Sequence, residues 1–271
     1  MNLIIRSSTR ILLLALGTLL LVSCASAPPA TPEARGQLAP SGRIRAAINY
    51  GNPALAARNP ATGELRGISV LLSQELGRRV GVPVELVGYD AAGKLVAALK
   101  AGEMDVGFLA VDPARAEDVA FTAPYMEVEV TYVVPERSDL QSVSQVDRPG
   151  IRVSVTSKNA ADLFLTRELK HASLVRVANE AAAFAALQGG SAEAYATNHQ
   201  ALLSLSEKYP GYRAVSGRFT TIPHALGVPV ARTAAAEYLR RFVEEAKASG
   251  LVGRVIDQSG VRGVVVAPPA K

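Results

Sequence analysis

The sequence is poor in the residues that mark several classes of protein. Its 271 residues include one cysteine, no tryptophan and only 5% aromatic residues. A single cysteine excludes an intrachain disulfide and a zinc site built from cysteines. The three histidines, His171, His199 and His224, show no metal-ligand spacing, so we predict no metal site and no cofactor.

Concentrated basic runs and catalytic motifs are also missing. The 29 Lys and Arg residues are scattered among 24 Asp and Glu residues, whereas nucleic-acid-binding domains usually carry a basic stripe. We therefore expect no nucleic acid as a partner. The chain has no Gly-x-Ser-x-Gly motif, no glycine-rich phosphate loop and no evident pair of catalytic acids. No apolar run of about 18 residues follows Cys24, so that part is not expected to span a membrane.

The amino-terminal segment has the features of a lipoprotein signal. Arg6 and Arg10 supply positive charge, and residues 11–22 form an apolar run too short to cross a bilayer. The small residue Ser23 and then Cys24 follow, so we predict a signal peptide over 1–23 and a diacylglycerol thioether on Cys24. The alternative is an ordinary secretory signal that happens to contain a cysteine. Both interpretations place the protein outside the cytoplasm, in the periplasm or at the cell surface, and the first adds a lipid anchor.

A Pro/Ala/Ser-rich segment follows the cysteine and lacks helical and strand periodicity. This composition predicts a solvated, flexible tether over 24–41. The folded part is then expected over about 42–266, which is long enough for one large core or two smaller ones.

Beyond residue 42, predicted strands alternate with predicted helices. Apolar residues recur near the helical period over 69–80, and 106–111 is an unbroken apolar run typical of a strand covered on both faces. The other predicted strands are 43–49, 84–88, 151–155, 174–177 and 192–197, and the other predicted helices are 94–100, 160–170, 180–187, 199–208 and 233–249. The order predicts an α/β fold, and its recurrence on either side of about residue 135 suggests two similar lobes with a cleft between them.

One segment resembles a known family. Residues 102–125 read GEMDVGFLAVDPARAEDVAFTAPY, which is similar to the first-lobe motif of the family 3 solute-binding proteins of polar amino-acid ABC transporters. The residues in register are Asp105, Pro113, Arg115, Phe121, Pro124 and Tyr125. Shorter matches at 67–72 and 151–155 extend the resemblance to nearly all of 43–255.

The resemblance implies a two-lobed, type II periplasmic-binding-protein-like α/β fold. Its second lobe, 134–225, is inserted in the first lobe, 42–133 and 226–271. Two crossover segments, expected near 132–134 and 225–227, form the hinge.

Arg115 is the leading candidate for a ligand contact. A guanidinium at the carboxyl end of a strand can hold a carboxylate with two hydrogen bonds, and ligands of open α/β sheets bind at such ends. The resemblance implies that this arginine clamps the ligand's α-carboxylate. The alternative is a solvated side chain that pairs with Glu117 or Asp118.

Other expected ligand positions depart from the family pattern. Asp112 stands where threonine is usual, and Asn198 replaces the aspartate that pairs with the ligand's ammonium group. The predicted ligand contacts are Arg115, Asp112, Ala110, Tyr50, Asn52, Ser157, Lys158, Asn159 and Asn198. In the alternative interpretation, Asn159 and Asn198 are helix N-caps, Tyr50 and Phe108 are core residues, and Lys158 is solvated. Without the aspartate the cleft favours a carboxylate with little positive charge, unless Asp112 turns inward.

These features predict an extracytoplasmic, lipid-anchored, monomeric binding protein. It would capture a small carboxylate-bearing solute, an amino acid or related organic acid, by closure of the hinge, and deliver it to an ABC permease. One alternative is an enzyme on the same scaffold, similar to cyclohexadienyl dehydratases, with Glu193 or Lys158 as the acid. Another is the ligand-sensing domain of a signalling system.

Overall fold

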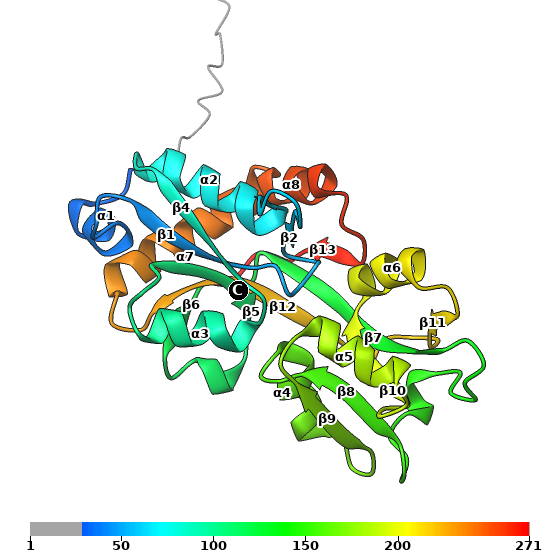
Figure 1. The fold of residues 1–271 in the computed structure, drawn as a ribbon. Coiled ribbons are helices and arrows are strands. Elements are labelled where there is room, and N and C mark those ends of the chain that lie inside the picture. Colours follow the sequence, from blue (N-terminus) through cyan, green and yellow to red (C-terminus); the bar gives the residue numbers. More distant parts are fainter. Residues whose placement is uncertain (1–28, 271) are drawn as a thin grey trace, which may run out of the picture.

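The computed structural model describes residues 29–270, and in this range helices cover a mixed β-sheet (Figure 1). The predicted signal peptide and Cys24 lie outside the described residues. The helices are α1 (Pro32–Leu38), α2 (Ile68–Val80), α3 (Ala92–Lys100), α4 (Ala160–Glu168), α5 (Glu180–Gln188), α6 (His199–Lys208), α7 (Thr233–Ala248) and α8 (Leu251–Ser259), with 3-10 turns η1 (Pro113–Arg115) and η2 (Val143–Gln145). The strands are β1 (Ile44–Asn49), β2 (Ala57–Arg58), β3 (Leu65–Arg66), β4 (Val84–Tyr89), β5 (Val106–Ala110), β6 (Val119–Phe121), β7 (Met126–Pro135), β8 (Arg152–Thr156), β9 (Ser173–Val177), β10 (Ala194–Asn198), β11 (Tyr212–Ala214), β12 (Thr220–Pro229) and β13 (Val264–Val266).

A single sheet of 11 strands runs through the described part of the chain, with β2 and β3 forming a separate small sheet. Strands β4, β1 and β5 are parallel at one end, and β10, β8 and β9 are parallel at the other. The antiparallel strands β12 and β7 lie side by side in the middle and join the two halves. The predicted parallel units are therefore present, but they belong to one mixed sheet.

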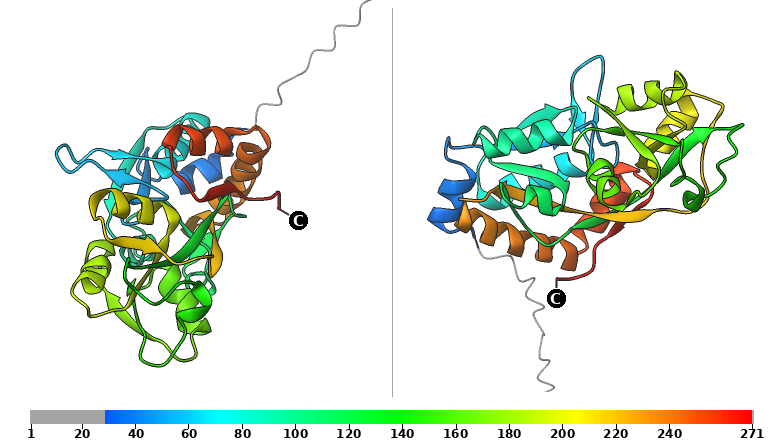
Figure 2. Two further views of the ribbon diagram at one scale, coloured as in Figure 1. Left: turned by 90° about the vertical axis from the view of Figure 1, so that its right-hand side faces the viewer. Right: turned by 90° about the horizontal axis from the view of Figure 1, so that it is seen from below.

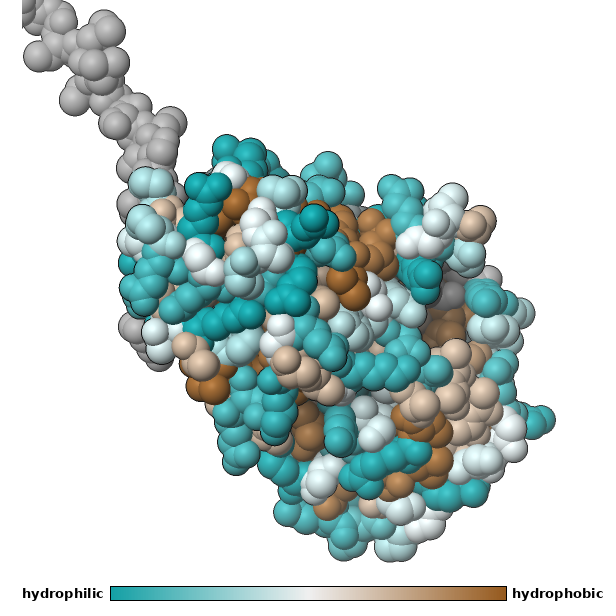
Figure 3. Space-filling view, turned by 60° about the vertical axis from the view of Figure 1, so that its left-hand side comes forward, coloured by the Kyte–Doolittle hydropathy of each residue, from teal (hydrophilic) through white to brown (hydrophobic). Residues whose placement is uncertain are grey.

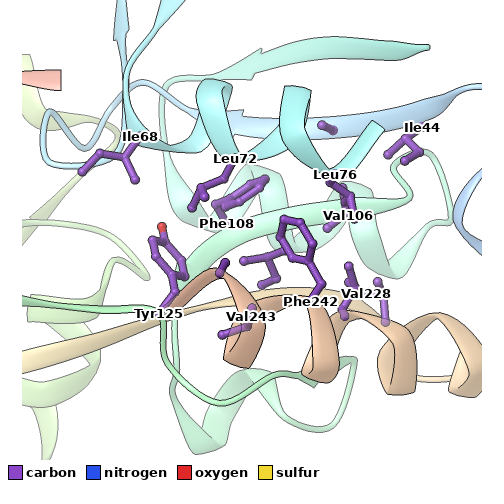
Figure 4. Close-up of a cluster of buried hydrophobic side chains, with 14 of the residues drawn as sticks. Ile44, Ile68, Leu72, Leu76, Val106, Phe108, Tyr125, Val228, Phe242 and Val243 are labelled. Atoms are coloured by element: carbon purple, nitrogen blue, oxygen red, sulfur yellow. The ribbon is translucent and has the colours of Figure 1, made fainter. Parts of the chain in front are cut away.

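Each half of the sheet has its own hydrophobic core, and we call the two halves the first lobe and the second lobe. The first-lobe core joins α1, α2, α7 and α8 to one face of the sheet, and α3 covers the other face. Neighbouring residues of β1 show this division, because Ile48 packs in the first group and Ala47 in the second. Figure 4 shows Leu72 and Leu76 of α2 facing Phe108 and, beyond it, Phe242 of α7.

The second-lobe core lies between β8, β10 and the start of α4, with Tyr132 and Val134 of β7 as members. Met126 and Val128 of the same strand belong instead to the first-lobe core. Between them, Val130 packs with Ile222 of β12 and with Ala110 in a small separate cluster. Strands β7 and β12 thus pass from one lobe to the other near Val130 and Ile222, earlier in both strands than the predicted crossovers.

The predicted tether is wrong over its last part, because residues 32–38 form helix α1. Thr31 Oγ1 accepts a hydrogen bond from the Ala34 amide at 3.1 Å, and proline occupies the first helical position. Ala34 and Leu38 are buried against the first-lobe core, next to α7. A helix with only two inward-facing apolar residues is too short to show a readable period.

Asp105, the acidic residue of the motif, is fully buried where β5 begins. Its carboxylate accepts hydrogen bonds from the Arg45 amide at 2.8 Å, from Arg45 Nε at 2.9 Å and from Arg232 at 2.6 Å. These bonds lower the pKa of Asp105 although burial opposes the shift. Asp105 therefore links β1 and the start of α7 to the start of β5.

Both ends of the described chain lie on the first lobe (Figure 2). After β13, Ala267 donates its amide hydrogen to the Tyr125 carbonyl, and Lys247 bonds to the Pro268 carbonyl. The face in Figure 3 is mainly hydrophilic, and its hydrophobic residues lie in separate small groups. In the described range, every helix is too short or too polar to cross a bilayer.

Candidate functional site

A cavity of about 50 Å³ lies between the two lobes. Its first-lobe and crossover residues are Asn49, Gly51, Asn52, Leu55, Asp90, Ala91, Ala92, Leu109, Ala110, Arg115, Val128, Val130, Ile222 and His224, and its second-lobe residues are Thr156, Asn159, Ala160, Ala161, Glu180, Thr197 and Asn198. One water needs roughly 10–15 Å³ of such volume, so the cavity holds only a few waters. The lobes therefore lie close together and leave little free space between them.

Arg115 is buried in this cavity and connects the lobes. It ends the 3-10 turn η1, which Asp112 caps by accepting a hydrogen bond from the Ala114 amide at 2.9 Å. The guanidinium donates to the Ala110 carbonyl of the first lobe and to the Lys158 carbonyl of the second lobe, both at 2.8 Å. The residue is only 4% exposed, so the solvated alternative is wrong.

The charge of Arg115 is poorly compensated. Among residues 29–270 it forms no ion pair, and its two hydrogen bonds, one within the first lobe and one to the second, both go to neutral carbonyls. Burial lowers the pKa of the guanidinium to about 10, and Asp112 partly opposes the shift. A carboxylate placed in the cavity would supply the missing negative charge.

Two further side-chain contacts join the lobes. Asp112 pairs with Arg167 of α4 at 3.0 Å, and Asn198 Nδ2 donates to Asn52 Oδ1 at 2.8 Å. Together with Arg115 they form what we call the inter-lobe contacts. The Asp112 carboxylate forms an ion pair with Arg167 and does not turn toward the cavity.

The two asparagines of the second lobe are helix N-caps, as the alternative interpretation predicts. Asn159 Oδ1 accepts from the Asp162 amide at 2.8 Å, and Asn198 Oδ1 accepts from the Ala201 amide at 2.9 Å. Both residues also line the cavity. Capping uses only the oxygen of each asparagine, and the amide group of Asn198 donates to Asn52 while Asn159 also hydrogen-bonds to Glu180.

The structure brings five of the nine predicted ligand residues to the cavity: Ala110, Arg115, Asn52, Asn159 and Asn198. Tyr50, Asp112, Ser157 and Lys158 are outside its lining.

The contacts of Tyr50 and Lys158 show why these two residues lie outside the cavity lining. The Arg58 guanidinium lies 5.5 Å from the centre of the Tyr50 ring, so this ring packs against a surface cation. Lys158 has an exposed side chain and a left-handed backbone with φ of 59°, and its carbonyl is what reaches Arg115. The loop that contains Lys158 therefore contacts Arg115 through a backbone oxygen and not through the lysine side chain.

Glu180 and His224 line the cavity although neither was predicted there. Glu180 is the first residue of α5, and part of the residue is exposed to solvent. Its carboxyl group is nevertheless buried, and this burial raises the pKa of the carboxyl to about 8. Asn159, Thr197 and Thr156 oppose the shift by hydrogen bonding. Burial lowers the pKa of His224 to about 4, the contact with the Ile222 carbonyl opposes this, and the charge of Arg115 adds to it. No local motif marks either residue, since the neighbours of each come from parts of the chain distant in sequence.

These two shifts predict opposite pH effects on stability. Glu180 keeps its proton in the folded state up to pH about 8 but loses it near 4.5 when unfolded, so the free energy of unfolding falls as pH rises through that window. His224 stays neutral down to about 4 but gains a proton near 6.5 when unfolded, so stability falls as pH drops from 6.5 to 4.

We expect Glu180→Gln to become progressively more stable than the parent between pH 5 and pH 8, by an amount on the order of a few kcal/mol. Urea unfolding of both proteins at matched pH values measures the difference. Glu193→Gln, which removes a partly exposed carboxylate, is the control and should show no such rise. An unchanged difference across the window would mean that the Glu180 carboxyl is solvated.

The position of Glu193 does not favour the enzymatic alternative. Glu193, considered as a catalytic acid, forms an ion pair with Arg152 at 2.6 Å and is absent from the lining. Within the described residues, no group of three His, Cys, Asp or Glu side chains could hold a metal ion.

The chain resembles known proteins along most of its length. The sequence profile of the bacterial extracellular solute-binding proteins, family 3, matches residues 44–259. The ABC transporter glutamine-binding protein GlnH of Bacillus subtilis is 22% identical over 197 residues, which cover 71% of this chain and 72% of GlnH. The virulence sensor protein BvgS of Bordetella pertussis is 31% identical over 172 residues, which cover 63% of this chain but only 13% of BvgS.

A solved structure confirms the predicted fold. The crystal structure of a mutant of ArgBP from T. maritima superposes with a TM-score of 0.73 at 22% identity, over 84% of this chain and 99% of that chain. The two-lobed, type II arrangement expected from the motif is therefore correct.

Proposed function

Because this chain belongs to the bacterial extracellular solute-binding proteins, family 3, we propose that it captures a small carboxylate-bearing solute and delivers it to an ABC permease. The observation that carries the proposal is Arg115, a buried cation between the lobes whose hydrogen bonds to Ala110 and Lys158 both go to neutral carbonyls. We propose that it acts as a monomer and without a cofactor. GlnH, a glutamine-binding protein of an ABC transporter, supports the same kind of partner.

Binding requires the lobes to separate and close again. A cavity of about 50 Å³ is small beside the roughly 300–1,000 Å³ of typical small-molecule sites. A solute therefore enters when the lobes part at the β7 and β12 crossovers, and Arg115 exchanges a carbonyl for the solute's carboxylate. Contacts to both lobes then stabilise the closed form, which the permease would recognise.

A thermal-shift screen tests the proposal. The panel contains the standard amino acids, the 2-oxo acid of each one except proline, and a set of aromatic acids and dicarboxylates. A solute at about 100 times its dissociation constant stabilises the folded state by about 2.7 kcal/mol, which gives a readable rise in melting temperature. If every compound leaves the melting temperature unchanged, the protein binds a different class of solute and the proposal is wrong.

We also propose that Cys24 carries a lipid anchor. When the full chain is expressed in bacteria, the parent protein is expected to partition into the detergent phase, whereas Cys24→Ser should partition into the aqueous phase. The thioether that holds the lipid cannot form on serine, and a diacyl chain contributes about 0.8 kcal/mol per buried CH₂. Equal partitioning of the two proteins would contradict the lipoprotein interpretation.

The similarity to BvgS favours a second candidate, a ligand-sensing role in a signalling system. The similarity covers only 13% of that sensor, so it extends to one part of BvgS and not to its signalling activity as a whole. Uptake of the identified solute by cells with and without the gene separates the candidates. Loss of uptake supports transport, and unchanged uptake with a lost transcriptional response supports sensing.

We propose no enzymatic function. Glu193 lies in a partly exposed ion pair, and the Lys158 side chain is exposed on the surface. The two acids considered from sequence are therefore not positioned to act in the cleft.

A further inference from the structure

A series of hydrogen bonds runs from the crossover strand β12 across the cavity to the second lobe. His224 Nδ1 lies 3.0 Å from the Ile222 carbonyl oxygen, and His224 Nε2 lies 3.4 Å from Asn52 Nδ2. Asn198 Nδ2 donates to Asn52 Oδ1 at 2.8 Å, and Asn198 Oδ1 accepts from the Ala201 amide at 2.9 Å. His224 and Asn198 are both buried, so water does not readily replace their partners. We call these four contacts the cross-lobe network.

The direction of each bond in the cross-lobe network is fixed by its neighbours. A carbonyl oxygen only accepts, so His224 Nδ1 carries the hydrogen and the neutral ring leaves Nε2 as an acceptor. At the other end the Ala201 amide only donates, so Asn198 must turn its Nδ2 toward Asn52. Asn52 Oδ1 also accepts from the Ala54 amide at 3.1 Å, which leaves Asn52 Nδ2 to face the ring. The network is therefore complete only while His224 is neutral.

A second proton on the His224 ring would break this order. Protonation turns Nε2 into a donor, which would then face the donor Asn52 Nδ2. Asn52 cannot turn its amide over without losing the Ala54 amide and the Asn198 side chain as donors to its oxygen. The conflict falls on the bond that joins the lobes, because Asn52 belongs to the first lobe and Asn198 to the second.

We propose that His224 is a positioning residue for lobe closure, and that its protonation opens the lobes. The residue acts through Asn52, whose amide it orients for the bond to Asn198. Its place on β12 suits this role, because that strand passes from one lobe to the other near Ile222, two residues away. Acid would then weaken the binding of any solute that both lobes hold. Closure itself needs no solute, so this inference can be tested separately from the proposed function.

The charges around His224 favour the neutral ring. Burial lowers the pKa of His224 to about 4, the Ile222 carbonyl opposes this, and the charge of Arg115 in η1 adds to it. The residues that face His224 in register on β5 and β7 carry no charge. Asp90, which precedes α3, and Glu180 of α5 are the other titratable groups among the described residues that line the cavity. Parting the lobes would relieve the burial, so proton uptake as pH falls from 6.5 toward 4 favours the open form.

Spin-label distances between the lobes test the inference. The labels are attached to Ala97→Cys on α3 and Glu168→Cys on α4, both exposed positions, in a Cys24→Ser background that has no other cysteine. Pulsed electron spin resonance without solute then reports the closed and open populations between pH 7 and pH 4. We expect the closed population of the parent to fall by roughly half or more at pH 4, because a group is half protonated at its pKa.

Two variants separate His224 from other groups that titrate in this range. His224→Gln keeps an acceptor that gains no proton, so its lobes should stay closed at pH 4. Asn52→Asp places an oxygen opposite the ring, which accepts from protonated His224 while the other oxygen accepts from Asn198, so this variant should also stay closed. His171→Gln, which removes an exposed histidine of the second lobe, is the control and should open as the parent does. Circular dichroism at each pH confirms that every variant is folded.

Nitrogen NMR supplies a readout that a merely structural role would not move. The chain has three histidines, so the rings of isotope-labelled protein can be assigned by comparing the parent with His171→Gln and His224→Gln. We expect His224 to carry its hydrogen on Nδ1 at pH 7. A hydrogen on Nε2 would overturn the inference.

The distance measurements can also overturn it. If the parent stays closed at pH 4, or if His224→Gln or Asn52→Asp opens as the parent does, His224 does not control closure. Opening in His224→Gln would point to ion pairs such as that of Asp112 with Arg167. None of these results decides whether the protein binds a solute, which the thermal-shift screen tests at neutral pH.

Discussion

Replacing Arg115 with glutamine is expected to reduce affinity for the solute by about 30-fold or more. Removing one partner of a buried charge pair costs about 2–5 kcal/mol, because the carboxylate is left desolvated without its cation. A glutamine amide can still donate to one of the carbonyls of Ala110 and Lys158, so the lobes keep part of their contact. The folded state should therefore lose less stability than the complex does.

Calorimetry with the solute found in the screen measures this loss, and urea unfolding without solute measures the cost to the protein itself. Arg241→Gln is the matched control, because this arginine lies on α7 and pairs with Glu237 at the surface. The control should bind as the parent does. Unchanged affinity in Arg115→Gln would show that Arg115 serves only to join the lobes.

Replacing Asp105 with asparagine is expected to lower the free energy of unfolding by about 3–5 kcal/mol. The carboxylate is fully buried and holds the side chains of Arg45 and Arg232 as well as a backbone amide. An asparagine keeps the size but not the charge, and its amide nitrogen would face donors. Both arginines would then remain near the protein interior without their shared anion.

Urea unfolding of Asp105→Asn and of Asp118→Asn makes the comparison. Asp118 pairs with the exposed Lys100 at 2.9 Å, and surface pairs of this kind contribute about 0–1 kcal/mol. The difference between the two variants isolates the effect of burial. Equal losses would mean that Asp105 and its arginines contribute no more than a surface ion pair.

Strong periodicity explains which elements could be predicted. The apolar pattern over 69–80 gave α2 to within a residue, and the unbroken apolar run from Val106 gave β5, whose residues are all buried. Helix α1 escaped prediction because two buried residues define no period. Strands β7 and β12 were missed as elements, although the expected hinge segments fall inside them. Their antiparallel pairing depends on partners about 90 residues apart in sequence, a separation that local pattern does not report.

The residues of the candidate site likewise include some that the sequence indicates and some that only the structure reveals. Arg115 belongs to a motif whose spacing is local, and the structure places it in the cavity lining, in the 3-10 turn that follows β5. Glu180 appears in sequence only as the first acidic residue of an alanine-rich helix, a position where acids are common on exposed helices. Its enclosure involves Asn159, Thr156 and Thr197, which come from other elements of the second lobe, and it therefore required the structure.

The inter-lobe contacts have a consequence for how a cell would use this protein. Arg115, Asp112 and Asn198 join the lobes through the protein's own groups, so closure does not depend wholly on a solute. An importer that recognises closure would then be engaged by protein that carries no cargo, and would hydrolyse ATP without transport. Solute binding would add to this basal rate, and the number of these contacts would set the ratio of productive to wasted cycles.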